Sequence, residues 1–103
     1  MKINTLLYAA LATSAYAHKD FASAVEYVRN SPAAAVSDEN KLKVYGLFKQ
    51  AEKGDCGEGS LSFSPINIAK RKAWCSNKGM SKETAEELYV QTIDNLVPSW
   101  RRV

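Results

Sequence analysis

A tyrosine and a lysine stand one helical turn apart in the heptapeptide YGLFKQA, residues 45–51. On a helix, Tyr45 and Lys49 share one stripe of the surface, while Leu47 and Phe48 fall on a neighbouring stripe that suits a core. A ring beside an ammonium group suits a ligand that carries an aromatic base and a phosphate. The pattern is equally typical of an amphipathic helix with an ordinary surface lysine and a half-buried tyrosine. The heptapeptide alone leaves both interpretations open.

The pairing of a cation with a ring recurs further along the chain. Lys70 and Trp74 are four residues apart and belong to a basic cluster that includes Arg71 and Lys72. Tyr89 falls on a face rich in apolar residues, where its hydroxyl needs a partner. Trp74 by itself is more typical of a core. The recurrence of the same pairing favours a ligand site.

Side chains that could carry out catalysis are scarce. His18 is the only histidine, so no Ser/His/Asp or Cys/His group can be assembled. The glycines at 54, 57 and 59 precede no Lys-Ser/Thr pair and follow no strand, which argues against a phosphate-cradling loop. The net charge of +3, from 14 basic and 11 acidic residues, is too weak and dispersed for nucleic-acid binding. We therefore expect a binding protein and no enzyme.

Cys56 and Cys75 are the only cysteines, and neither belongs to a C-x-x-C pair. With a single histidine they cannot form a zinc site, so no metal is expected. If the chain is secreted, a Cys56–Cys75 disulfide is compatible with its compartment; in the cytoplasm the two residues are ordinary thiols. The sequence leaves these alternatives open.

Residues 1–17 differ in composition from the rest of the chain. They contain one charge, Lys2, and a short apolar run over residues 6–12, and they end in Ala15-Tyr16-Ala17, which has the form of a signal-peptidase site. We expect cleavage after Ala17, leaving a domain of residues 18–103 in the secretory pathway or outside the cell. The alternative is an N-terminal helix that is retained in a cytoplasmic protein.

Helical start and stop signals divide the rest of the chain. Ser37 is a suitable N-cap for a helix that ends at Gly54, and Ser81 caps a helix bounded by Pro98. Pro32 ends the first helix. No stretch alternates with a period of two, so we expect an all-α bundle of four helices. These helices are expected over about residues 19–29, 37–53, 66–77 and 81–97.

Several sequence blocks in this order and near-spacing resemble the acyl-CoA-binding protein family. They are YGLFKQA at 45–51, GDC at 54–56, KRKAW at 70–74 and KGMSKE at 78–83. The resemblance extends over about residues 19–97. It implies a four-helix bundle with up-down-down-up connectivity and a site for long-chain fatty acyl-CoA thioesters.

The resemblance also implies roles for individual residues. Tyr45, Lys49 and Lys70 match residues around the adenine and ribose 3′-phosphate, and Tyr89 matches a tyrosine at the nucleotide end. Arg29 stands where the family often has a lysine near the phosphates. The positions that match the lining of the acyl groove are Phe21, Leu42 and Phe48.

The chain departs from the family pattern at three places. Arg71 stands where the family usually has a tryptophan, which puts the packing of the acyl groove in question and adds a cation that could contact a phosphate. Glu58-Gly-Ser-Leu replaces an Arg-Pro-Gly loop, and Phe48 replaces a frequent tyrosine, with the loss of one hydroxyl. We expect binding to survive, with altered affinity or chain preference.

We thus expect a monomeric carrier that binds medium- to long-chain acyl-CoA one to one and needs no cofactor. Alternatives are a secreted interaction or signalling protein that uses its surface or a released peptide, and a carrier of another lipid, given Arg71. The tail Trp100-Arg101-Arg102 is interpreted either as an exposed, flexible end or as a transient contact with a membrane surface.

Overall fold

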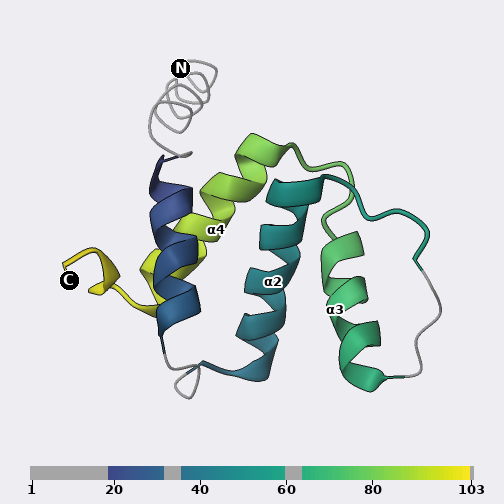
Figure 1. Cartoon of the computed structure of the whole chain (residues 1–103), viewed down its shortest axis with the longest axis horizontal. Coiled ribbons are helices and arrows are strands. Elements are labelled where there is room, and N and C mark those ends of the chain that lie inside the picture. Colours follow the sequence, from purple (N-terminus) through teal and green to yellow (C-terminus); the bar gives the residue numbers. More distant parts are fainter. Residues whose placement is uncertain (1–18, 32–35, 60–63, 103) are drawn as a thin grey trace, which may run out of the picture.

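A computed structural model describes residues 19–31, 36–59 and 64–102 of the chain, and the expected signal peptide lies outside them. In these ranges there are four α-helices and no strand, which confirms the all-α bundle (Figure 1). A short 3-10 helix, η2, follows the last α-helix. The elements are a helix over residues 19–30, α2 (Asp38–Lys53), α3 (Pro65–Cys75), α4 (Lys82–Leu96) and η2 (Trp100–Arg102).

The ends of α2 and α4 follow from local capping chemistry. The Ser37 hydroxyl accepts a hydrogen bond from the amide of Asn40 at 3.2 Å, and that of Ser81 accepts one from the amide of Thr84 at 3.1 Å. Gly54 ends α2 with a φ of 81°, a conformation that favours glycine. The expected bounds of these helices are confirmed. Helix α3 ends two residues earlier than expected, in a turn over residues 76–79.

The four helices have up-down-down-up connectivity, as Figure 1 shows. The helix over residues 19–30 and α4 run in one direction, and α2 and α3 run in the opposite one. Helix α2 occupies the middle of the bundle and packs against both α3 and α4. One face of α2 therefore contacts α3, and another contacts α4.

The apolar core lies between the helix over residues 19–30, α2 and α4. Helix α3 contributes no buried residue and covers the other side of α2. The buried apolar residues are Phe21, Ala24, Leu47, Ala51, Ala85, Tyr89, Val90, Ile93 and Trp100.

Gly46 sets the distance between α2 and α3. A Cβ atom at this position would lie 2.5 Å from the carbonyl oxygen of Ala73, a backbone atom that cannot move away cheaply. The missing side chain thus allows the backbones of α2 and α3 to approach closely. This contact brings the rings and cations on the two helices within reach of one another.

A buried glutamine joins the C-terminal end of α2 to the turn before α4. Gln50 is 0% exposed, and its Nε2 donates to Asp55 Oδ1 at 2.9 Å and to the Met80 carbonyl at 2.8 Å. Asp55 Oδ1 also accepts from the Gly79 amide at 2.8 Å. The hydrogen bond from Gly79, reinforced by that from Gln50, lowers the pKa of the Asp55 carboxyl.

The C-terminal tail docks on the bundle, so the expectation of an exposed end is wrong for Trp100. This residue is 7% exposed; its Nε1 donates to Asp94 Oδ1 at 2.7 Å, and its ring centroid lies 5.8 Å from that of Tyr27. Arg101 bridges Asp94 and Asp20 at 3.1 and 3.4 Å. Because its N–H is hydrogen-bonded, the indole can be buried without the free-energy cost of an unpaired polar group, and this favours docking of the tail.

Candidate ligand-binding site

A cavity of about 610 Å³ lies against α2 and α3, and we call it the basic pocket. Three lysines and an arginine line it, together with two aromatic rings; among the described residues of its lining there is no aspartate or glutamate. Such a lining attracts an anion with several charges. The lining residues are Tyr45, Lys49, Gly59, Asn67, Ile68, Lys70, Arg71, Lys72, Trp74 and Cys75.

Two of the lysines lie over rings of the neighbouring helix. Lys49 Nζ is 5.0 Å from the centroid of Trp74, and Lys70 Nζ is 5.0 Å from that of Tyr45. The sequence paired each lysine with the ring on its own helix, whereas the structure exchanges the partners across the α2–α3 contact. A cation held over a ring is attracted by the electrons of its face, and its ammonium keeps three donors for a ligand.

The segment after α2 reaches the basic pocket, where Gly59 is one of the lining residues. Cys56 and Cys75 form a disulfide with a Cα–Cα distance of 5.2 Å. The Arg71 guanidinium donates to the carbonyl of Gly57, and Trp74 Nε1 donates to that of Gly54 at 2.8 Å. Arg71 therefore lies in the basic pocket, among its cations.

A second cavity, of about 440 Å³, lies on a neighbouring face of α2, toward the helix over residues 19–30 and α4, and we call it the apolar pocket. It is enclosed by the helix over residues 19–30, α2 and the C-terminal half of α4. Most of its lining is aliphatic or aromatic, and Arg29 and Lys41 contribute positive charge. The lining residues are Val25, Tyr27, Val28, Arg29, Ser31, Val36, Lys41, Val44, Tyr45, Phe48, Tyr89, Ile93, Leu96 and Val97.

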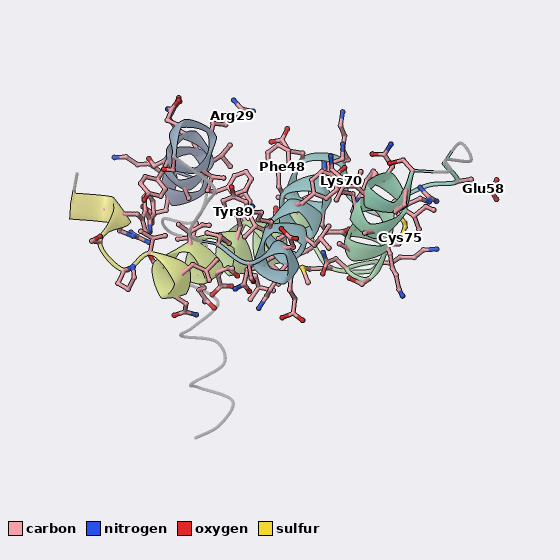
Figure 2. The ribbon with its side chains drawn as sticks, turned by 90° about the horizontal axis from the view of Figure 1, so that it is seen from below. Arg29, Phe48, Glu58, Lys70, Cys75 and Tyr89 are labelled. Atoms are coloured by element: carbon pink, nitrogen blue, oxygen red, sulfur yellow. A yellow bond between two sulfur atoms is a disulfide. The ribbon has the colours of Figure 1, made fainter. Side chains whose placement is uncertain are left out.

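Tyr45 lines both cavities and so joins them. In Figure 2, Phe48 and Tyr89 lie between α2 and the helix over residues 19–30, whereas Lys70 belongs to α3 on the other side of α2. An anionic group bound near Lys70 and an apolar chain bound near Phe48 could therefore belong to one molecule that passes Tyr45. This arrangement suits an amphipathic ligand with a charged head.

Comparison with known proteins agrees with this geometry. The family model described as "Acyl CoA binding protein" matches residues 18–93. The chain belongs to the acyl-CoA-binding protein family. The resemblance seen in the sequence blocks is thereby confirmed.

Relatives and solved structures of the family cover most of the bundle. A Mus musculus protein named diazepam-binding inhibitor-like 5 is 42% identical over 62 residues, 59% of this chain and 71% of its own. An acyl-CoA-binding protein homolog of Manduca sexta is 35% identical over 85 residues, 79% of this chain and 91% of its own. The solution structure of an acyl-CoA-binding protein from Babesia bovis T2Bo has a TM-score of 0.71 and 40% identity, covering 81% of this chain and 96% of its own.

The structure brings together most of the residues that the family resemblance singled out. Tyr45, Lys49 and Lys70 line the basic pocket. Arg29 and Phe48 line the apolar pocket, and in Figure 2 both lie on the same side of the molecule as Lys70. Most of the predicted residues thus line one of the two cavities, and Tyr45 lines both.

Tyr89, which the resemblance places at the nucleotide end, lines the apolar pocket here. It is 2% exposed, and its ring makes an edge contact with Phe21 at a centroid distance of 5.1 Å. Burial raises the pKa of the Tyr89 phenol to about 12, and the charge of Arg29 offsets only part of this. The folded protein therefore keeps this phenol protonated up to a higher pH than that of an exposed tyrosine.

Two predicted residues line neither cavity. Phe21 is buried behind the apolar pocket, where its ring contacts those of Tyr89 and Phe48. Leu42 is half-buried on α2. Phe21 thus supports the pocket from behind.

Other lining residues were not singled out as site residues from the sequence. Val25 and Val28 have the spacing of one helical face, but spacing alone does not show whether such a face lines a cavity or packs in the core. Lys41 at the apolar pocket had no signal beyond its charge.

Within the described ranges, no helix is long and apolar enough to cross a bilayer. In the same part of the chain no group of three or more His, Cys, Asp or Glu side chains could hold a metal ion.

Proposed function

We propose that this protein binds medium- to long-chain fatty acyl-CoA esters one to one and acts as a carrier and pool former for them. The observation that supports this most directly is the position of Tyr45 on both cavities. The nucleotide phosphates then bind in the basic pocket, and the acyl chain leaves water in the apolar pocket.

The chemistry of the two pockets fits the two ends of this ligand. Lys49 and Lys70 give charge-assisted hydrogen bonds to phosphate oxygens, which are stronger than neutral ones. The ring of Tyr45, between the pockets, offers a face for the adenine to stack on. Each methylene removed from water contributes up to about 0.8 kcal/mol, so affinity should rise about fourfold per methylene until the apolar pocket is filled.

Titration calorimetry with palmitoyl-CoA, CoA and palmitate tests the proposal. We expect the thioester to bind far more tightly than either part alone, because only the thioester occupies both pockets. The absence of binding with any acyl-CoA would refute the proposal and leave an interaction or signalling role on the same fold. Tight binding of palmitate alone would instead indicate a carrier of another lipid.

Two variants test the assignment of the basic pocket. Lys49→Ala and Tyr45→Ala should each weaken palmitoyl-CoA binding ten- to a hundredfold, roughly the value of a charge-assisted or stacking contact. Lys43→Ala is the matched control, because Lys43 is exposed on the same helix and lines neither pocket. Equal affinity of the Lys49 and control variants would contradict the assignment.

We also propose that the mature protein begins at His18 and resides in the secretory lumen or outside the cell. The form of residues 15–17 and the Cys56–Cys75 disulfide support this, since disulfides persist in oxidising compartments. The intact mass of the protein from its native source should correspond to residues 18–103 with two hydrogens fewer than the dithiol. A chain that starts at Met1 would contradict it.

A further inference from the structure

The segment over residues 54–59 is held against α3 by three contacts, and we call it the 54–59 arm. The carbonyl of Gly54 accepts from Trp74 Nε1, Cys56 is joined to Cys75, and the carbonyl of Gly57 accepts from Arg71. The disulfide is the only covalent contact among the three. It lies between the two hydrogen bonds along the arm, so it limits how far either of them can open.

Arg71 is positioned by the part of the arm that the disulfide holds. A Cβ atom at Gly59 would lie 2.5 Å from Arg71 Nη1, so the guanidinium lies directly against the backbone of the arm. Cys75 follows Arg71 by one helical turn, so both emerge from the same region of α3. The guanidinium has five donors, and the Gly57 carbonyl engages one of its nitrogens. Donors therefore remain for a ligand in the basic pocket, which Arg71 and Cys75 both line.

We propose that Arg71 recognises a phosphate of the bound ligand, and that the Cys56–Cys75 disulfide holds it in place to do so. The affinity for acyl-CoA then depends on the redox state of the protein. This inference rests on the proposed acyl-CoA binding and names a way in which that binding is regulated.

The redox step is an ordinary thiol–disulfide exchange with a dithiol reductant. One thiolate of the reductant attacks the disulfide and forms a mixed disulfide, and its second thiolate then closes the reductant's own disulfide. The Cys56–Cys75 bond breaks, both sulfurs become thiols, and two electrons and two protons pass from the dithiol to the protein. After reduction, hydrogen bonds alone hold the arm, and these exchange readily with water.

The effect should be confined to ligands that carry phosphates. None of the described residues that line the apolar pocket belongs to the 54–59 arm or to α3. Loss of the disulfide should therefore act mainly on the basic pocket, which among the described residues shares only Tyr45 with the apolar pocket. A thioester without a nucleotide, such as S-palmitoyl-pantetheine, is the internal control.

Calorimetry on the full chain, oxidised and reduced, tests the inference. Tris(2-carboxyethyl)phosphine is a suitable reductant, because it does not cleave thioesters; it becomes its oxide with an oxygen atom from water. Reduction should raise the thiol count from zero to two per chain and weaken palmitoyl-CoA binding roughly tenfold, the value of one charge-assisted contact. Binding of S-palmitoyl-pantetheine should change less than twofold, and reoxidation should restore the original affinity.

Variants separate the role of Arg71 from a general loosening of the fold. Arg71→Gln should weaken palmitoyl-CoA binding as much as reduction does, and reduction should then have no further effect. Lys43→Gln, an equal change of charge outside both pockets, should leave affinity and redox response unchanged. Cys56→Ser/Cys75→Ser should behave like the reduced protein, with circular dichroism as the check that it is folded.

The outcomes distinguish this inference from the proposed function. If neither redox form binds palmitoyl-CoA, the proposed function fails. Equal affinity of the two forms would overturn the redox inference alone. Equal weakening of both ligands would also overturn it, since that indicates a loosened bundle. A redox response that persists in Arg71→Gln would remove Arg71 from the mechanism.

Discussion

Each lysine expected at the phosphate end of the ligand lies over an aromatic ring of the neighbouring helix. Lysine has a long, flexible side chain, and ordering it costs as much as about 2 kcal/mol. Contact of Lys49 with Trp74, and of Lys70 with Tyr45, meets part of that cost before a ligand arrives. The rings thus preorganise the cations, a role that their types alone did not reveal.

Tyr89 lines the apolar pocket and is also part of the core. Its neighbours Phe21 and Phe48 hold the ring, and the same burial raises the pKa of its phenol to about 12. In the unfolded chain the phenol titrates near its ordinary value of about 10. Between these values the folded protein retains a proton that the unfolded chain loses, so stability falls as the pH rises.

This predicts a pH-dependent difference between the wild type and Tyr89→Phe. The stabilising contribution is fully present below about pH 10, and roughly 1 kcal/mol of it is lost at pH 11, halfway to the folded pKa. Urea unfolding at pH 8, 10 and 11 should show the wild type losing more stability than Tyr89→Phe. Parallel curves for the two proteins would show that the phenol is not held neutral by burial.

At the scale of elements, the approach of α2 to α3 depends on one glycine. Gly46 lies against the carbonyl of Ala73, and the lysine–ring pairs lie on either side of this contact. Because α3 buries no residue of its own, it depends on this contact and on the 54–59 arm for its position. The basic pocket is therefore more sensitive to the α2–α3 distance than the core is.

Gly46→Ala should push α3 away from α2. Overpacking against a backbone atom costs about 1–3 kcal/mol, which outweighs the better helix propensity of alanine, about 1 kcal/mol. We expect a lower free energy of unfolding and weaker palmitoyl-CoA binding, as measured by urea titration and calorimetry. Gly57→Ala is the control, because nothing lies within 4 Å of a Cβ at that position. If Gly46→Ala changed neither the free energy of unfolding nor the affinity, α2 and α3 would have space for the added methyl group.

The C-terminal tail is an element of the bundle in its own right. Trp100 packs on Tyr27, and Arg101 bridges α4 and the helix over residues 19–30 through Asp94 and Asp20. The exposed ion pairs contribute little by themselves. The buried ring carries most of the stabilisation, and it lies beyond the stretch matched by the family model, residues 18–93.

Trp100→Ala should lower the free energy of unfolding by about 3 kcal/mol or more, the usual effect of removing a buried tryptophan. Trp100→Phe keeps a ring against Tyr27 but loses the hydrogen bond to Asp94, so its cost should be nearer 1–3 kcal/mol. Thermal unfolding followed by circular dichroism compares the two. A stability of Trp100→Ala equal to that of the wild type would mean that the tail is not docked in solution.

At the scale of the whole molecule, one cross-link connects the loop after α2 to the end of α3. Cys56 and Cys75 are separated by 19 positions, so the disulfide closes a loop of moderate length in the unfolded chain. The disulfide lowers the conformational entropy of the unfolded chain, so it stabilises the native state relative to the unfolded state. A domain of this size has a limited core and gains proportionately from such a cross-link.

Cys56→Ser/Cys75→Ser should lower the free energy of unfolding by about 3 kcal/mol, as expected for closing a loop of this length. The urea m-value should rise, because the unfolded variant is less compact and exposes more surface. Reduced wild-type protein should give the same values and so serves as the control. A stable variant with unchanged m-value would show that the unfolded chain gains no freedom when the cross-link is removed.

The sequence predicted the ends of α2 and α4, the bundle and the family, because these depend on local signals. Ser37, Gly54 and Ser81 act on backbone groups within a few residues, so their effect can be derived from sequence spacing. The family resemblance also pointed to Phe21 as a residue that lines the acyl groove. A match to a family position does not show how deeply a side chain is buried. In the structure Phe21 lies behind the apolar pocket rather than on its lining.

Only the tertiary structure decided how distant residues meet. Lys49 and Trp74 are 25 positions apart, and their contact depends on how closely Gly46 allows α3 to approach. The pairing of the cysteines, the position of Arg71 on the 54–59 arm and the burial of Trp100 are likewise contacts between segments far apart in the chain. Their geometry depends on packing of the whole bundle, whereas a helix cap depends on its own few residues.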